Sequence, residues 1–185
     1  MKPRVWLLTA VAALWACAPA VPVAQPVAAS EEVIPGFDAE RVRTDLQKTA
    51  RERFGDALTD RALASPAYLL SKHYMGLAPP PIVQPDGSYK YPDPPMAMLI
   101  RENGQWLAAT ATGFRRAKPD QATAIDAMIA DRAFWAEPAW AQPGCTDAGG
   151  SLLMLKAPQR ARIVRQGACG ATQHTERLVF LGLEA

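Results

Sequence analysis

Apolar residues recur at helical spacing after residue 37. One face of this segment consists of apolar residues four apart, namely Val42, Leu46, Ala50 and Phe54. Asp38 is placed as the N-cap, and Phe37 before it can form a hydrophobic staple with Val42. Gly55 ends the pattern. We predict a helix from Asp38 to Phe54 with one buried face, followed by a short second helix over residues 56–64.

Two later segments fit either a helix or a strand. Ser65-Pro66 is a typical helix start for residues 66–75, whereas the apolar run 68–70 equally suits a strand. Residues 175–183 favour a helix, although the apolar run 178–181 also suits an edge strand. The sequence leaves both alternatives open.

Seven prolines lie between residues 79 and 95. Proline fixes φ and has no backbone N–H, so this density excludes a helix or a central strand. Pro85-Asp86-Gly87 is a turn signal, and Tyr89 and Tyr91 lie among the prolines. Two interpretations stay open for this Pro-rich loop: a solvent-exposed connector, or an extended segment that presents a binding surface.

A β-hairpin is predicted around Asn103-Gly104, the preferred pair for a tight two-residue turn. Residues 96–102 form its first strand and residues 105–114 its second. Alternation would place the following side chains on one face of the second strand: Trp106, Ala108, Thr110, Thr112 and Phe114. Apolar residues also occur on the other face, so we expect other elements to pack on both sides.

Residues 118–135 predict one helix and one further turn. Lys118-Pro119-Asp120 opens the helix, and its apolar stripe contains Ile125, Met128 and Ile129. Asp131 is placed to cap the turn that follows, which contains Phe134 and Trp135. We expect this aromatic pair to belong to the core.

A second hairpin is predicted near the C-terminus. Residues 151–157 fit a buried strand, Pro158-Gln159 the turn and residues 161–166 the return strand. Cys145 lies before the first strand and Cys169 after the second, so the hairpin brings them together. We predict a disulfide between them, which would stabilise the fold by about 3 kcal/mol.

This order of elements is typical of the α+β class. We predict an antiparallel sheet built from the two β-hairpins and covered by helices, with one disulfide. Residues 36–185 suit a single domain that can bury a core, with the Pro-rich loop at residues 79–95 inside it.

Residues 1–17 have the pattern of an export signal. Lys2 and Arg4 form a positive n-region, and the apolar run 5–16 is shorter than the about 20 residues that a transmembrane helix needs. Residues 18–35 follow as an Ala/Pro-rich tether. Small residues suitable for cleavage end at Ala20, Ala24 and Ala29.

Leu14-Trp15-Ala16-Cys17 resembles the lipobox of bacterial lipoproteins, although a small or β-branched residue is usual at the position of Trp15. The resemblance implies that Cys17 is lipidated, which leaves Cys145 and Cys169 as an even pair in an oxidising compartment. The alternative is removal of Cys17 with an ordinary signal peptide. In both cases we predict an exported, periplasmic chain; lipidation would anchor it to the outer membrane.

The balance of basic and acidic residues indicates which class of partner the protein could bind. Removal of Lys2 and Arg4 from the 20 basic residues leaves 18, which equals the number of acidic residues. A near-neutral domain lacks the basic surface expected of a nucleic-acid binder. We therefore predict no nucleic-acid partner, and contact with a membrane only through a lipid on Cys17.

The sequence contains none of the common catalytic or cofactor motifs. A nucleophile elbow, a phosphate-binding loop and a dinucleotide fingerprint are all missing. His73 and His174 have no clustered ligands at metal-binding spacing, and Cys145 and Cys169 lack Cys-x-x-Cys spacing. We therefore predict no catalytic residues, no metal site and no cofactor.

Candidate binding residues fall in two places. Tyr89 and Tyr91 lie in the Pro-rich loop. Arg160 and Arg162 would share a face of the last predicted strand, where they could meet an anionic polymer or lipid. The alternative for the arginines is a solvated edge strand whose charges prevent aggregation.

Two classes of function remain. The first is a non-catalytic binding or accessory domain of the bacterial envelope, inhibitor-like or otherwise, with a protein or cell-wall partner. The second is a small periplasmic hydrolase that uses His73 with an aspartate such as Asp93. The missing catalytic motifs favour binding over catalysis.

The intact mass of the protein from membrane and soluble fractions tests the leader and the disulfide. A lipoprotein should begin at Cys17 with added acyl mass in the membrane fraction; an ordinary signal should give a soluble species that begins near Val21 or Ser30. Reduction should raise the mass by about two units, one hydrogen per sulfur. An unchanged mass would contradict the disulfide between Cys145 and Cys169.

Overall fold

The computed structural model describes residues 37–74, 80–141, 149–167 and 172–185. Strands of the main sheet are β1 (Tyr68–Tyr74), β4 (Met96–Glu102), β5 (Gln105–Thr110), β6 (Gly113–Arg116), β7 (Trp140–Ala141), β8 (Gly150–Ala157) and β9 (Arg160–Gly167). A separate two-stranded sheet consists of β2 (Ile82–Val83) and β3 (Tyr89–Lys90). The helices are α1 (Ala39–Phe54), α2 (Asp56–Ala64), α3 (Pro119–Ala130), α4 (Arg132–Ala136) and α5 (Gln173–Glu184).

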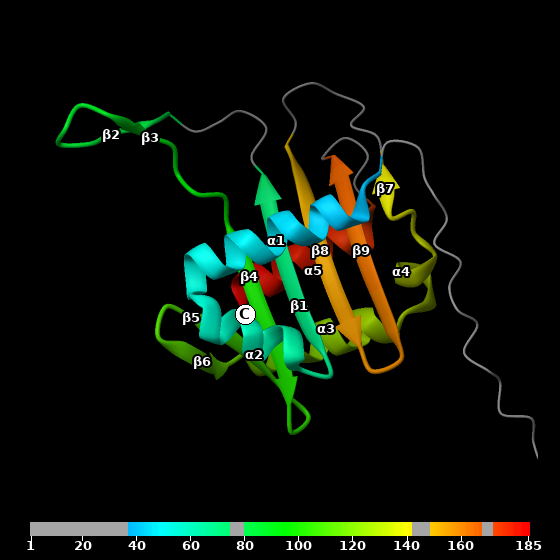
Figure 1. Ribbon diagram of the computed structural model, residues 1–185. Coiled ribbons are helices and arrows are strands. Elements are labelled where there is room, and N and C mark those ends of the chain that lie inside the picture. Colours follow the sequence, from blue (N-terminus) through cyan, green and yellow to red (C-terminus); the bar gives the residue numbers. More distant parts are fainter. Residues whose placement is uncertain (1–36, 75–79, 142–148, 168–171) are drawn as a thin grey trace, which may run out of the picture. The chain divides into compact units, whose positions relative to one another are not determined.

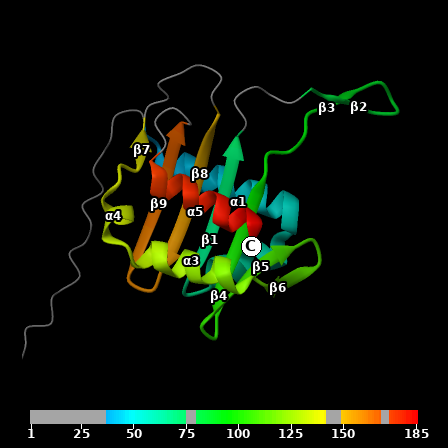
Figure 2. The same cartoon turned by 180° about the vertical axis from the view of Figure 1, so that it is seen from behind.

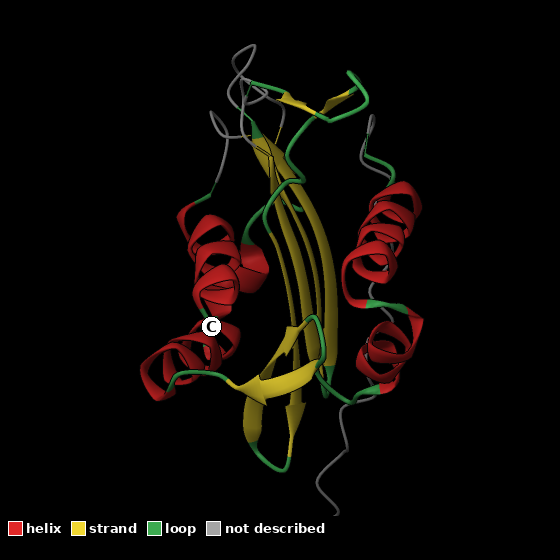
Figure 3. Ribbon diagram, turned by 90° about the vertical axis from the view of Figure 1, so that its left-hand side faces the viewer, coloured by secondary structure: helices red, strands yellow, loops and turns green. Residues whose placement is uncertain are grey.

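The main sheet has seven strands in the order β6-β5-β4-β1-β8-β9-β7 (Figure 1). All neighbouring strands pair antiparallel except β7, which runs parallel to β9. Helices cover both faces of this sheet (Figure 3). One face packs against α1 and α2, and the other against α3, α4 and α5, which Figure 2 shows from behind.

Alternate side chains of the central strands enter two separate cores. Leu69, Leu99 and Leu153 pack toward α3, α4 and α5, together with Phe134 and Leu178. The neighbouring strand residues enter the core beneath α1 and α2: Leu70, Met98, Ile100, Leu152 and Met154. Burial on both faces explains why these strands are continuous apolar runs rather than alternating ones.

The N-terminal helices confirm the sequence prediction. The Asp38 carboxylate accepts a hydrogen bond from the backbone N–H of Arg41 at 2.9 Å, as an N-cap does. Val42, Leu46 and Ala50 are buried, and Gly55 follows the last turn with a φ of 85°. None of the helices among the described residues is long and apolar enough to span a membrane.

The strand predicted over residues 105–114 is wrong in its second half. Asn103 and Gly104 both have positive φ, 49° and 77°, and form the predicted turn between β4 and β5. A further turn at residues 111–112 then reverses the chain into β6. Alternation restarts after this turn, so Trp106 and Phe114 lie in opposite cores rather than on one face.

The α+β class is confirmed, but the sheet is larger than two hairpins. Residues 66–75 contain the strand β1, which lies between β4 and β8, and residues 175–183 belong to the helix α5. The strands β6 and β7 extend the two edges. Cys145 and Cys169 lie outside the described residues, so the disulfide stays a prediction.

The Glu137 side chain caps α5 although it lies far from it in sequence. Its carboxylate accepts hydrogen bonds from the backbone N–H groups of His174 and Thr175, both at 3.1 Å, and from the Thr175 hydroxyl at 2.9 Å. The Thr172 hydroxyl donates to the same carboxylate. A negative charge at this end also suits the helix dipole.

This cap gives stability a dependence on pH. Burial alone would raise the pKa of the Glu137 carboxyl, but the hydrogen bonds from Thr172, Thr175 and His174 together outweigh it and lower the pKa. A carboxyl whose pKa is lowered by folding stabilises the native state above its ordinary pKa of 4.5. That contribution is lost as the pH falls below this value.

We predict that Glu137→Ala lowers the free energy of unfolding by about 2 kcal/mol at neutral pH, because several hydrogen bonds to a charged acceptor are lost. The difference from wild type should shrink as the pH falls below 4.5. Urea unfolding at a series of pH values measures both effects.

Glu176→Ala is the matched control. Glu176 lies in the same first turn of α5 and forms no ion pair or side-chain hydrogen bond with the described residues. Its replacement should change stability by less than about 0.5 kcal/mol. A Glu137→Ala effect that is constant from neutral to acid pH would contradict the assigned role of the carboxylate.

Candidate functional site

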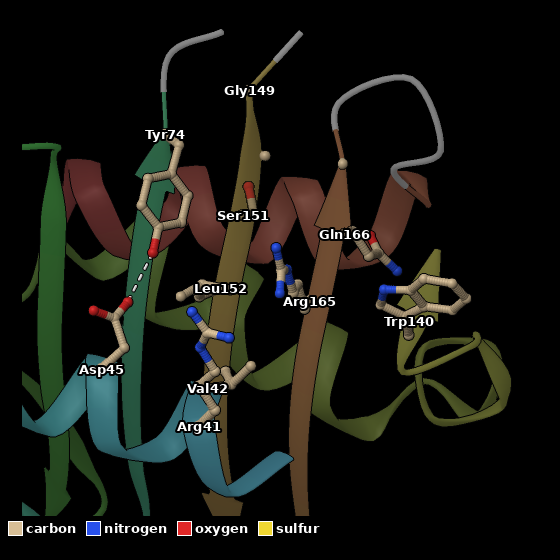
Figure 4. Close-up of a pocket in the computed structure, with 12 residues that line it drawn as sticks. Arg41, Val42, Asp45, Tyr74, Trp140, Gly149, Ser151, Leu152, Arg165 and Gln166 are labelled. Carbon is tan, nitrogen blue, oxygen red and sulfur yellow. Dashed lines mark hydrogen bonds between the residues drawn. The ribbon is translucent and has the colours of Figure 1, made fainter. Parts of the chain in front are cut away.

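A cleft with a volume of about 580 Å³ lies in the described part of the chain. It lies between the first turns of α1 and the ends of β1, β8 and β9, with β7 at its side (Figure 4). Its principal side chains are Arg41, Asp45, Tyr74, Trp140, Leu152 and Arg165. The volume suits a small organic ligand.

Strand register explains why this surface is hollow. Leu152, Arg165 and Trp140 are register partners across β8, β9 and β7, so they share the face beneath α1. The next row on this face pairs Tyr74 with Gly150, and Gly150 with Gly167. Since neither glycine has a side chain, the sheet is uncovered beside Tyr74.

Gly150 has a steric reason to be glycine. A Cβ atom at this position would lie 2.5 Å from the Gln166 carbonyl oxygen, which belongs to the paired strand. No side chain fits without moving β9 away from β8. The close pairing of β8 with β9 therefore requires glycine at position 150. The same glycine leaves the cleft open because it has no side chain.

A polar cluster forms the wall of the cleft on the side of β1. Lys72 Nζ lies 3.1 Å and 3.3 Å from the two carboxylate oxygens of Asp45 and donates to Thr49 Oγ1 at 3.1 Å. The Tyr74 hydroxyl donates to Asp45 Oδ2 at 2.7 Å. Asp45 thus joins α1 to β1.

Tyr74 is held as a hydrogen-bond donor. Burial raises the pKa of its hydroxyl, and the bond to the Asp45 carboxylate raises it further, while the nearby Arg165 charge lowers it. The net pKa lies well above the ordinary tyrosine value. Tyr74 therefore stays protonated at neutral pH, so it cannot act as a base there.

Two arginines in the cleft have no acidic partner among the residues that the structure describes. The guanidinium groups of Arg41 and Arg165 point into the space (Figure 4). Neither forms an ion pair or a side-chain hydrogen bond with the described residues. Asp45 is the only acid among the described lining residues, and its oxygens already accept from Lys72 and Tyr74.

The Pro-rich loop contains a short hairpin with an exposed apolar surface. Val83 lies opposite Tyr89 across β2 and β3. The exposed fractions are 55% for Ile82, 64% for Val83, 70% for Tyr89 and 58% for Tyr91. Among the described residues, Phe180 is the only other exposed large apolar side chain, with an exposed fraction of 40%.

The turn of this hairpin is fixed by its own hydrogen bonds. Asp86 Oδ1 accepts from the backbone N–H of Ser88 at 2.9 Å and from its hydroxyl at 2.6 Å. The Gln84 backbone N–H donates to the Ser88 carbonyl oxygen at 2.7 Å. The predicted Pro85-Asp86-Gly87 turn is therefore confirmed, and the loop is a defined hairpin.

Arg160 and Arg162, the two arginines predicted to bind an anionic partner, differ in exposure and in their contacts. Arg160 is exposed, with its guanidinium carbon 5.5 Å from the centre of the Trp135 ring. Arg162 is only 9% exposed and donates to the backbone carbonyl oxygens of Phe134 and Glu137. The Arg162 side chain is therefore buried rather than solvated, since α4 and the segment after it cover this part of β9.

His73 and Asp93, the pair named for the alternative hydrolase, have different described contacts. His73 Nδ1 lies 3.2 Å from Ser151 Oγ, and its ring packs against Phe180 on the face of α5. Asp93 lines a small hollow with Lys72 on the opposite face and pairs with Lys90 at 3.9 Å. The sheet therefore separates His73 from Asp93.

His174 also has different partners from its sequence neighbour Glu176. Its Nδ1 lies 2.7 Å from Glu137 Oε1, and its Nε2 lies 3.5 Å from Asp131 Oδ2. Within the residues that the structure describes, no cluster of three or more histidine, cysteine or acidic residues could hold a metal ion. Cys17 lies outside these residues, as do both cysteines of the predicted disulfide.

Sequence reasoning missed the cleft. Arg41 resembled the other charged residues of α1, and Arg165 resembled its neighbours on β9. The adjacent Gly149-Gly150 pair was the one available signal, because glycine inside a strand marks a close approach of backbones. Whether this glycine pair opens a cleft depends on the strand register, which the sequence does not provide.

Comparison with protein families, with curated proteins and with solved structures found no match to this chain. The function is therefore inferred from the residues and their geometry alone.

We predict that replacement of Asp45 and replacement of Lys72, the ion pair in the cleft wall, lower the free energy of unfolding by different amounts. The side chain of Lys72 is 9% exposed and that of Asp45 is 40% exposed. Asp45→Ala leaves a buried ammonium without its counter-ion, so it should lower the free energy of unfolding by about 3 kcal/mol. Lys72→Met fills the same volume and leaves a hydrated carboxylate, so it should cost about 1 kcal/mol or less.

Urea unfolding of both variants measures this difference. Tyr74→Phe serves as the control for the hydrogen bond alone, because it keeps the ring and should cost about 1 kcal/mol. A larger loss for Lys72→Met than for Asp45→Ala would contradict the assignment of the buried charge to Lys72.

Proposed function

We propose that the chain is a non-catalytic binding or accessory domain of the bacterial cell envelope, which contacts a protein partner through the β2–β3 hairpin. The observation that supports this proposal is that four large apolar side chains are exposed in one short hairpin and the residue after it: Ile82, Val83, Tyr89 and Tyr91. Large exposed apolar groups that gather in one place are typical of interaction sites.

The hairpin is suited to binding because its conformation is already defined. The hydrogen bonds of the Asp86–Ser88 turn order it before any partner arrives, which reduces the entropy cost of association. Burial of its aliphatic and tyrosine side chains would contribute about 25 cal/mol per Å² of apolar surface.

Two features favour a protein over a cell-wall polymer. Ile82 and Val83 are aliphatic and offer nothing that a hydrated glycan would recognise. Tyrosine beside aliphatic residues is a common composition of protein interfaces. A cell-wall polymer would favour a surface of aromatic side chains alone, on which its sugar rings could stack.

Export is supported by the leader and the tether. Residues 1–17 match an export signal, and residues 18–35 would allow the domain to reach partners at a distance from the membrane if Cys17 is lipidated. Catalysis has less support, because Ser151, the hydroxyl beside His73, is only 5% exposed.

Photo-crosslinking in cells tests the hairpin as the contact surface. We predict that a photoreactive residue at position 83, the register partner of Tyr89, forms a discrete protein adduct in the envelope. The double variant Tyr89→Ser, Tyr91→Ser should abolish that adduct. Because both side chains are exposed, the free energy of unfolding should change by less than about 0.5 kcal/mol.

Lys90→Ser, on the same strand, is the control and should retain the adduct. An adduct that survives the double tyrosine variant would exclude the hairpin as the contact surface. An adduct made of cell-wall polymer instead of protein would overturn the proposed partner class.

A further inference from the structure

Among the residues that the structure describes, the lining of the cleft beneath α1 has a net positive charge. Arg41 and Arg165 direct two guanidinium groups into it from a helix and a strand (Figure 4). In the absence of a described acidic partner, both groups can donate several hydrogen bonds to a ligand.

Asp45 does not cancel this charge. Its carboxylate lies within 3.3 Å of Lys72 Nζ through both oxygens and accepts from the Tyr74 hydroxyl at 2.7 Å. The ammonium of Lys72 balances the Asp45 carboxylate. Among the described lining residues, the positive charges of Arg41 and Arg165 are then in excess. The wall is therefore a closed polar cluster beside an open cationic space.

The remaining walls are flat or apolar. Trp140 and Tyr74 lie on opposite sides of the two arginines, and Leu152 lies on the floor between them (Figure 4). Aromatic and aliphatic walls around a few convergent polar donors are the usual composition of small-molecule sites. The glycines at 150 and 167 leave the space between the rings open.

We propose that this cleft binds a small organic anion, in which a carboxylate or phosphate group meets Arg41 and Arg165 and a ring-shaped body contacts Trp140 and Tyr74. Planar guanidinium groups match both kinds of anion through paired hydrogen bonds. The site shares no residue with the β2–β3 hairpin, so it does not depend on the proposed partner contact.

Isothermal titration calorimetry of the purified full-length chain tests this site. The probes are phenyl phosphate and benzoate, with benzyl alcohol as the neutral analogue and inorganic phosphate as the anion without a ring. We expect saturable binding of at least one ring-bearing anion, which identifies the preferred acid group. We expect weaker binding of inorganic phosphate and none of benzyl alcohol.

Arg165→Gln and Arg41→Gln should each weaken binding of the preferred anion roughly tenfold to a hundredfold, because each removes charge-assisted hydrogen bonds. Arg160→Gln and Arg43→Gln are the matched controls, from the same strand and the same helix but outside the cleft. Both controls should bind like wild type. Circular dichroism establishes that each variant is folded.

Trp140→Ala separates the ring contact from the charge. It should weaken phenyl phosphate or benzoate binding and leave inorganic phosphate unchanged. Equal affinity for phenyl phosphate and inorganic phosphate would overturn the role of the two rings. Unchanged binding in the Arg41 and Arg165 variants, or no binding of either ring-bearing anion at millimolar concentration, would overturn the site.

Discussion

Burial of the central strands on both faces is the constraint on which the rest of this structure depends. Strands β1, β4 and β8 supply side chains alternately to two cores, so a helical layer must cover each face of the sheet. The amphipathic helices α1 and α5 meet that requirement with their buried faces. A close approach of α5 follows from Gly182, where a Cβ atom would lie 2.7 Å from Leu69 Cδ2. The layers are therefore fixed by packing.

The same constraint decides what happens to charges on these strands. A charged group that is covered by a helix needs a partner in that layer, because an unpaired buried charge costs several kcal/mol. Lys72 finds Asp45 on α1, and Arg162 finds the carbonyl oxygens of Phe134 and Glu137 at the end of α4. Glu137 then uses its carboxylate to cap α5. These contacts join each helical layer to the sheet at defined positions.

Local signals in the sequence were sufficient for most elements and insufficient for their arrangement. The Asp38 cap, the Asn103-Gly104 turn and the Asp131 cap depend on a few adjacent residues, and all are present in the structure. Residues 66–75 remained ambiguous because β1 is buried on both faces and therefore lacks alternation. The buried state of Arg162 and the cleft depend on long-range register, for which a single sequence contains no signal.

Strand register also places the pair of His73 and Ser151 on one face of the sheet and the open cleft on the other. Residues on one strand face meet α5, which covers the pair of His73 and Ser151. Residues on the other face lie beneath α1, whose first turns leave Arg165 and the two glycines uncovered. Covalent catalysis needs a nucleophile that a substrate can reach, whereas recognition needs exposed donors and a defined shape. In the described part of the chain, the accessible surface has the second set of properties, and this observation supports the proposed binding role.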